Sequence, residues 1–166
     1  QTAVSGNVDL YTIDLNGNNL CQLTDDAFDE HSPVISPDLS KVFYFASGNG
    51  IRYIEIIDGS PSPFFSGEFE SLNFQHNPAS TTFVTSQNVG AGFDIYSFSY
   101  DGWTFSALAT DHAGNISPAW SRDDLRIVYI SSSSGTSQFM IMNADGSGSQ
   151  TIPNIPPNPS HPRWMP

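Results

Sequence analysis

The residues best able to do chemistry in this chain are carboxylates and histidines that recur in short polar stretches before apolar segments. They are Asp25, Asp26, Asp29, Glu30 and His31, then Glu68 and Glu70, then Asp111, His112 and Asn115, and finally His161. Clustered carboxylates attract cations and basic peptide segments. Hard cations need several convergent oxygens, but the sequence has no calcium-loop spacing. We therefore expect a face that binds a protein or peptide, with no metal ligand assigned and a bound cation as a secondary option.

Signatures of an enzyme are missing from the sequence. It has no Gly-x-Ser-x-Gly elbow, no His-Glu-x-x-His pair and no phosphate-binding glycine loop. We therefore expect a protein that is not an enzyme and that uses no cofactor. One alternative stays open, because a pair of facing carboxylates is all that a glycosidase needs. That alternative is a carbohydrate-active or otherwise hydrolytic protein.

The charge balance excludes some classes of partner. The formal net charge is -12, from 17 acidic residues against 5 Lys and Arg. Such a chain is repelled by a phosphate backbone and by anionic lipid surfaces. No apolar run approaches the roughly 18 residues that a membrane-spanning helix needs. We expect no nucleic-acid partner and no membrane insertion.

One apolar segment that ends in a tight turn recurs four times. The copies are Asp9–Gly17, Ile51–Gly59, Asp94–Gly102 and Gln138–Gly146, and their closing glycines lie 42, 43 and 44 residues apart. Asn-Gly or Asp-Gly between such strands predicts a two-residue hairpin turn, in which both turn residues have positive φ. A fixed period of this size is typical of a repeat protein.

A second element recurs in step with the first. Its copies are Ser32–Asp38, Ser71–His76, Ser117–Asp123 and His161–Pro166. An apolar strand follows all but the last copy, at 41–46, 81–85 and 126–131. A further short strand follows each glycine turn, at 20–24, 63–66, 104–109 and 150–153. Each period therefore holds four strands. Four strands in about 43 residues predict an all-β fold, a β-propeller of four four-stranded blades per chain.

The repeat resembles that of TolB-like propellers. The residues that carry the resemblance are Ser117–Ser121, Asn143–Gly146 and the pair Leu23-Thr24. The second copy departs from the pattern at Leu72 and at Gln75-His76, and the Pro-Asp-Gly turn is changed to Pro37–Leu39 and Arg122–Asp124. The resemblance implies a periplasmic or secreted domain that binds other proteins, or one that gates substrate in a peptidase.

The order of strands implies how the ring closes. We expect one propeller domain over 1–166, with blades at about 31–67, 68–110 and 111–153 and a split blade made of 1–30 and 154–166. The N-terminal strands would pair with the C-terminal innermost strand, because unpaired edges must be covered. Closure within one chain, closure of two chains as an eight-bladed homodimer, and a structural half-ring of a longer secreted protein all fit.

Two further features complete the expected binding face. His31, His112 and His161 lie at nearly equivalent repeat positions, where they could ring the mouth of a channel. Trp103 follows the Asp101-Gly102 turn, so we expect it near a surface edge. An exposed tryptophan there could anchor a partner.

Overall fold

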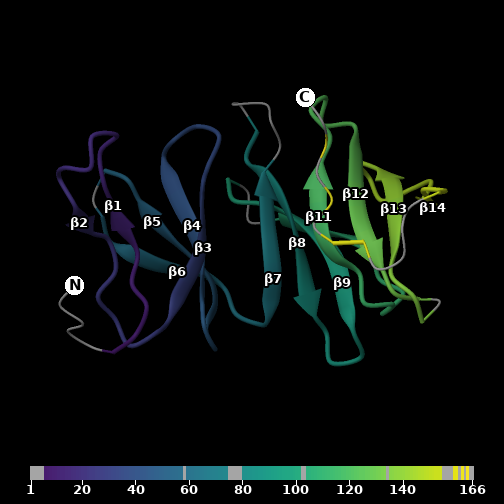
Figure 1. Cartoon of the computed structure of the whole chain (residues 1–166), viewed down its shortest axis with the longest axis horizontal. Coiled ribbons are helices and arrows are strands. Elements are labelled where there is room, and N and C mark those ends of the chain that lie inside the picture. The colour runs from purple at the N-terminus through teal and green to yellow at the C-terminus, as the bar shows by residue number, and fades with distance from the viewer. Residues whose placement is uncertain are drawn as a thin grey trace. The chain divides into compact units, whose positions relative to one another are not determined.

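The computed structural model describes residues 6–57, 59–74, 80–101, 104–133, 135–154, 159–160, 162 and 164. This part of the chain holds fourteen strands and no helix (Figure 1). It forms two compact units, Gln1–Glu68 and Phe69–Pro166, and each is described by itself. No helix among the described residues is long and apolar enough to cross a bilayer.

The first unit contains a two-stranded and a four-stranded antiparallel sheet. The small sheet pairs β1 (Tyr11–Thr12) with β2 (Cys21–Gln22). The larger sheet has the order β3-β4-β5-β6, and its strands are Glu30–Ile35, Lys41–Ala46, Gly50–Glu55 and Pro61–Phe65. Strand β6 lies at the edge and carries Pro61 and Pro63.

The second unit contains two four-stranded antiparallel sheets. In the first, β7 (Phe69–Phe74), β8 (Thr82–Asn88), β9 (Phe93–Ser99) and β10 (Thr104–Ala109) follow one another in space as in sequence. In the second, the same holds for β11 (Ile116–Trp120), β12 (Arg126–Ser131), β13 (Gln138–Asn143) and β14 (Gln150–Thr151). The predicted four-strand meander is therefore present in three complete copies.

The strand bounds agree with the repeat in most places. Strands β4, β10 and β12 have the bounds expected from their apolar runs. The exception is the predicted strand at 9–17, of which only Tyr11–Thr12 pairs in β1. None of the described residues of 154–166 lies in a strand, and closure of the ring stays a prediction.

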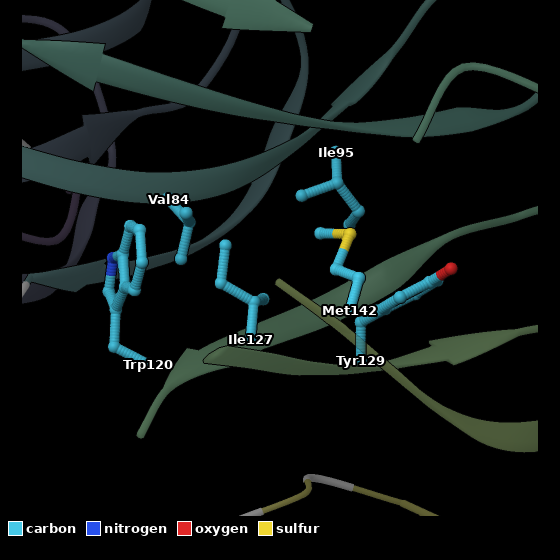
Figure 2. Close-up of a cluster of buried hydrophobic side chains, with 6 residues drawn as sticks. All are labelled: Val84, Ile95, Trp120, Ile127, Tyr129 and Met142. Carbon is cyan, nitrogen blue, oxygen red and sulfur yellow. The ribbon is translucent and has the colours of Figure 1, made fainter. Parts of the chain in front are cut away.

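Each unit has a core between its two sheets. In the second unit, side chains from β8 and β9 meet others from β11, β12 and β13, as Figure 2 shows for Val84, Ile95, Trp120, Ile127, Tyr129 and Met142. In the first unit, Leu10, Tyr44, Ala46 and Ile54 form the corresponding cluster. Each fully buried large side chain contributes about 1.5–3 kcal/mol. Sheets buried on both faces explain why the middle strands have continuous apolar runs.

The hairpin turns differ from the prediction. Gly17 and Gly146 have φ of 80° and 86°, but neither Asn16 nor Asp145 is among the residues with positive φ. The N–H of Gly17 donates to Asp14 O, and the N–H of Gly146 donates to Asn143 O, both over three residues. The turn is therefore a type I turn closed by a left-handed glycine, a longer loop than the two-residue one expected.

The Ser-Pro element makes a bulge at the start of two of the three four-stranded sheets. The pairing register shifts between His31 and Val34 and again between Ile116 and Ala119. Ser32 and Ser117, inside these bulges, have φ of 54° and 53°. Proline is tolerated after them because a bulge leaves a residue out of the hydrogen-bond ladder.

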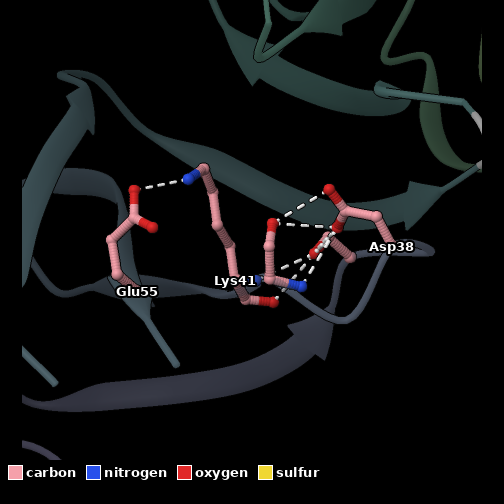
Figure 3. Close-up of polar contacts among 5 residues, drawn as sticks. Asp38, Lys41 and Glu55 are labelled. Atoms are coloured by element: carbon pink, nitrogen blue, oxygen red, sulfur yellow. Dashed lines mark hydrogen bonds and ion pairs between the residues drawn. The ribbon is translucent and has the colours of Figure 1, made fainter. Parts of the chain in front are cut away.

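A serine–aspartate clasp closes the turn between the first two strands. Ser36 Oγ donates to Asp38 Oδ1 at 2.6 Å and accepts from the N–H of Lys41 (Figure 3). Lys41 in turn forms an ion pair with Glu55 on the neighbouring strand. The second unit repeats the clasp with Ser121 and Asp123, where the hydrogen bond from Ser121 lowers the pKa of Asp123.

Candidate functional site

The loop that enters β3 exposes two carboxylates and turns two inward. Asp25 and Asp29 are exposed, and Asp29 Oδ1 also accepts the N–H of Val8. Asp26 is half-buried and forms an ion pair at 2.6 Å with Arg52 on β5. Burial alone would raise the pKa of Asp26, but hydrogen bonds from Phe28 N–H and Glu30 and the charge of Arg52 lower it. The carboxylate of Asp26 is therefore already paired with Arg52 inside the first unit.

Glu30 lies inside the first unit with only 1% of its surface exposed. Thr24 Oγ1 donates to Glu30 Oε2 at 2.6 Å and accepts the N–H of Leu10. Burial, with smaller contributions from Asp26 and Asp9, raises the pKa of Glu30 to about 7. A carboxyl group in this environment holds the sheets together and is not presented to a partner.

We call this contact between the two sheets of the first unit the first junction, and it comprises Asp9, Thr24, Asp26, Glu30, Tyr44 and Arg52. Tyr44 and Arg52 are paired across β4 and β5. The Tyr44 hydroxyl is buried with no partner among the described residues, and burial raises its pKa to about 12. Neither Tyr44 nor Arg52 was a predicted site residue.

His31 is exposed at the start of β3. Its Nδ1 lies 3.2 Å from Ser32 Oγ, and its ring packs against Phe45 with centroids 5.5 Å apart. The imidazole is therefore held by its neighbours, on the strand that leaves the loop.

The loop that enters β11 is held in the second unit by a backbone hydrogen bond equivalent to that of Glu30. Asn115 is 1% exposed, and its Nδ2 donates to Asp111 Oδ1 at 2.6 Å. Asp111 itself is exposed. The N–H of Asn115 donates to Phe93 O at 2.8 Å, as the N–H of Glu30 does to Val8 O at 2.8 Å. We call the contact between the two sheets of the second unit the second junction. It comprises Asp94, Ala109, Asp111, Asn115, Tyr129 and Met140.

His112 is the only predicted site histidine that the structure pairs with a carboxylate among the described residues. Asp94, fully buried on β9, accepts from the N–H of His112 at 3.0 Å, and its Oδ2 lies 2.8 Å from His112 Nδ1. A neutral imidazole with Nδ1–H on a carboxylate leaves Nε2 as an acceptor. His112 is exposed and is positioned to present that nitrogen to solvent.

The acidic pair at the start of β7, Glu68 and Glu70, is divided between the units. Glu68 is exposed in the first unit. Glu70, in the second, accepts from Ser117 N–H at 2.8 Å and Ser117 Oγ at 3.0 Å, and from Ser86 Oγ at 2.9 Å. Glu70 therefore fastens the bulge of β11 to the preceding sheet.

Some predictions cannot be placed. Trp103 and His161 lie outside the described residues. Within the described ranges, no group of three or more His, Cys, Asp or Glu side chains is arranged to hold a metal ion. The bound cation therefore stays a prediction. A single binding face formed by all the loops also stays a prediction, because the two units are described separately.

Sequence reasoning missed the strand residues that hold the loops. Asp9 and Asp94 occupy the same position in the repeat, and only the second meets a histidine. In the strand pairing, Arg52 takes the place that Tyr96 and Met140 take in the other two four-stranded sheets. Neither of those two residues is charged, so a single basic residue at this position is a signal that could have indicated a buried acidic partner.

No family model and no curated protein matches this sequence. Among solved structures, oligogalacturonate lyase from Vibrio parahaemolyticus is 14% identical with a TM-score of 0.70, over 87% of this chain and 46% of that one. A chain of a mitotic checkpoint complex is 15% identical with a TM-score of 0.65, over 88% and 44%. TolB from Acinetobacter baumannii also matches, with 15% identity and a TM-score of 0.42, over 86% and 48%.

These likenesses show the fold. The all-β meanders and the propeller-type neighbours confirm the β-propeller predicted from the repeat. The chain spans about half the length of the structures it matches.

Proposed function

We propose that this propeller is a non-catalytic scaffold that binds a basic segment of a protein or peptide through the loops entering β3 and β11. The observation that supports it most directly is how the charges are distributed. Lys41 and Arg52 are each paired with an acid of the same unit. The carboxylates of Asp25, Asp29 and Asp111 remain exposed on the loops. Exposed carboxylates on each loop accelerate encounter with cationic partners.

Two further observations fit the proposal. The overall charge of -12 favours a cationic ligand over an anionic one. One solved neighbour is a chain of a multiprotein assembly, the mitotic checkpoint complex, which supports protein partners in general. A periplasmic or secreted location and assembly as a homodimer belong to the same proposal, through the resemblance to TolB-like repeats.

The test uses a fluorescein-labelled nonalysine peptide, with binding followed by fluorescence anisotropy at low ionic strength. The loop variant is Asp25→Asn with Asp111→Asn. The matched control is Asp14→Asn with Asp145→Asn, which removes the same charge from turns at the opposite end of the sheets. Asparagine keeps the oxygen that accepts the turn hydrogen bonds of Asp14 and Asp145.

We expect the loop variant to weaken binding about 5- to 30-fold, since each of the two exposed pairs contributes about 0.5–1 kcal/mol. The control should change it less than twofold. Added salt should weaken wild-type binding. Equal losses in the two variants would show that only net charge matters, which contradicts a localised binding face.

One observation favours a hydrolytic alternative, and it has its own test. A buried aspartate that orients a histidine, as Asp94 orients His112, is a recurring part of a general-base site. We propose that this pair is structural. A screen of glycan and ester substrates should give no turnover. Turnover that disappears in His112→Ala would replace the scaffold proposal with an enzymatic one.

A further inference from the structure

Glu30 and Asn115 occupy the same position in the repeat. Each is the fourth residue after an acid of the entering loop, Asp26 or Asp111, and each stands two residues before a Ser-Pro pair. Each is 1% exposed and donates its backbone N–H to a carbonyl of the preceding sheet at 2.8 Å. The two side chains therefore occupy equivalent buried positions at the first and second junctions.

Only one of the two side chains is an obvious donor. Asn115 Nδ2 donates to Asp111 Oδ1. Glu30 is close enough to Asp26 for the two carboxyl groups to affect each other, but two ionised carboxylates have no proton to share. Glu30 Oε2 is satisfied by Thr24, whereas Glu30 Oε1 is buried and receives no hydrogen bond from any described donor. A buried oxygen of this kind is costly unless it is protonated or paired.

The groups around Glu30 increase this cost. Asp9 lies before β1 and Asp26 lies in the entering loop, and both add negative charge. From β5, Arg52 pairs with Asp26 through its Nη1. From β4, Tyr44 contributes a neutral hydroxyl. Among the described residues, the guanidinium is thus paired with Asp26, and Glu30 has no cation of its own.

We propose that Glu30 carries a proton in the folded chain and donates it to Asp26, as Asn115 donates to Asp111. The first junction then weakens as the pH rises, while the second does not share this response. The loop bearing Asp25 and Asp29 begins and ends at this junction, so its order follows the pH.

The direction of the pH dependence follows from linkage. The pKa of Glu30 is raised above its ordinary value of 4.5 to about 7. Between these two values the folded state binds more protons than the unfolded state, so stability falls as the pH rises. Below this window the contribution of Glu30 is complete, and above it the contribution is lost.

The test is hydrogen exchange of the full chain between pH 5 and pH 8, corrected for the intrinsic exchange rate. Peptides covering 6–31 report on the first junction, and peptides covering 92–116 report on the second. The variants are Glu30→Gln, a neutral donor of the same shape, and Asn115→Asp, which creates a carboxyl pair at the second junction.

At pH 5 we expect Glu30→Gln and wild type to protect 6–31 equally. At pH 8 the variant should be better protected, by a factor on the order of a hundred, because each pH unit of a pKa shift is tenfold in the equilibrium. Asn115→Asp should make protection of 92–116 fall with rising pH. Profiles of wild type and Glu30→Gln that stay parallel over the whole range would overturn the proposal.

A second measurement needs no variant. The carboxyl carbon of Glu30 in the ¹³C-labelled wild-type protein can be titrated by nuclear magnetic resonance. A midpoint well above the ordinary glutamate value supports the proposal, and a midpoint at or below that value contradicts it.

Discussion

The first junction holds an ion pair and an additional carboxyl group where the second holds an amide and a thioether. Arg52 and Glu30 in the first unit correspond to Met140 and Asn115 in the second. The backbone hydrogen bonds donated by Glu30 and Asn115 nevertheless have the same length, 2.8 Å. The comparison teaches that the repeat fixes the position of the side chain that donates to the loop aspartate. The charge of the residues around that position can differ between copies.

The largest effect that would sharpen this comparison comes from Arg52→Met, which places the methionine of the second junction into the first. We expect a loss of about 3 kcal/mol in the free energy of unfolding, because Asp26 loses its ion-pair partner inside the first unit. Urea unfolding followed by far-ultraviolet circular dichroism measures it.

Adding Thr24→Ala and Glu30→Asn to Arg52→Met completes the transfer. A buried charged group replaced by well-packed neutral residues is often tolerated, so most of the lost stability should return. If the triple variant is no more stable than Arg52→Met alone, the two junctions are not interchangeable.

The aspartates at equivalent positions, Asp9 and Asp94, should respond in opposite directions. Asp94→Asn removes the charged acceptor of His112 and should cost about 2 kcal/mol. Asp9→Asn removes a negative charge beside Glu30 and should be neutral or slightly stabilising at pH 8. Urea unfolding at pH 8, with tryptophan fluorescence for Asp94→Asn and circular dichroism for Asp9→Asn, tests both. A similar cost at the two positions would contradict the difference in environment.

The smallest effect concerns the turn between the first two strands of each sheet. Leu39 and Asp124 have φ of 59° and 57°, where the resembling repeats have glycine. Leucine tolerates this conformation worse than aspartate does. Leu39→Gly should therefore raise the free energy of unfolding by about 0.5–1 kcal/mol, and Asp124→Gly by less. Thermal unfolding of the two variants measures the difference, and an equal gain would show that the side chain does not matter.

The sequence predicted the periodic part of this molecule well. Alternating apolar runs and turn residues repeat every 42 to 44 residues, so the bounds of β4, β10 and β12 could be read from them. The turns were predicted one residue too short, because an Asp-Gly pair is compatible with both a two-residue loop and a type I turn closed by glycine.

The loops were harder to predict, since a loop has no period to show which side chain turns inward. Asp25 and Asp26 are neighbours, yet the first is exposed and the second binds Arg52, which lies 26 positions later. Glu30 was predicted as part of a binding face, but the structure places it inside the first unit. Comparing the copies position by position, Glu30 with Asn115 and Arg52 with Met140, is the step that reveals such residues.

The two prolines of β6 have a consequence for solubility. An edge strand normally offers a row of free amides to which a strand from another molecule can add. Pro61 and Pro63 lie opposite Ile54 and Arg52 on β5 and carry no amide hydrogen, so this border cannot template such growth. Strand β10, the corresponding edge in the second unit, has no proline. Under destabilising conditions, fibrils of this protein should therefore nucleate on the β10 border sooner than on that of β6.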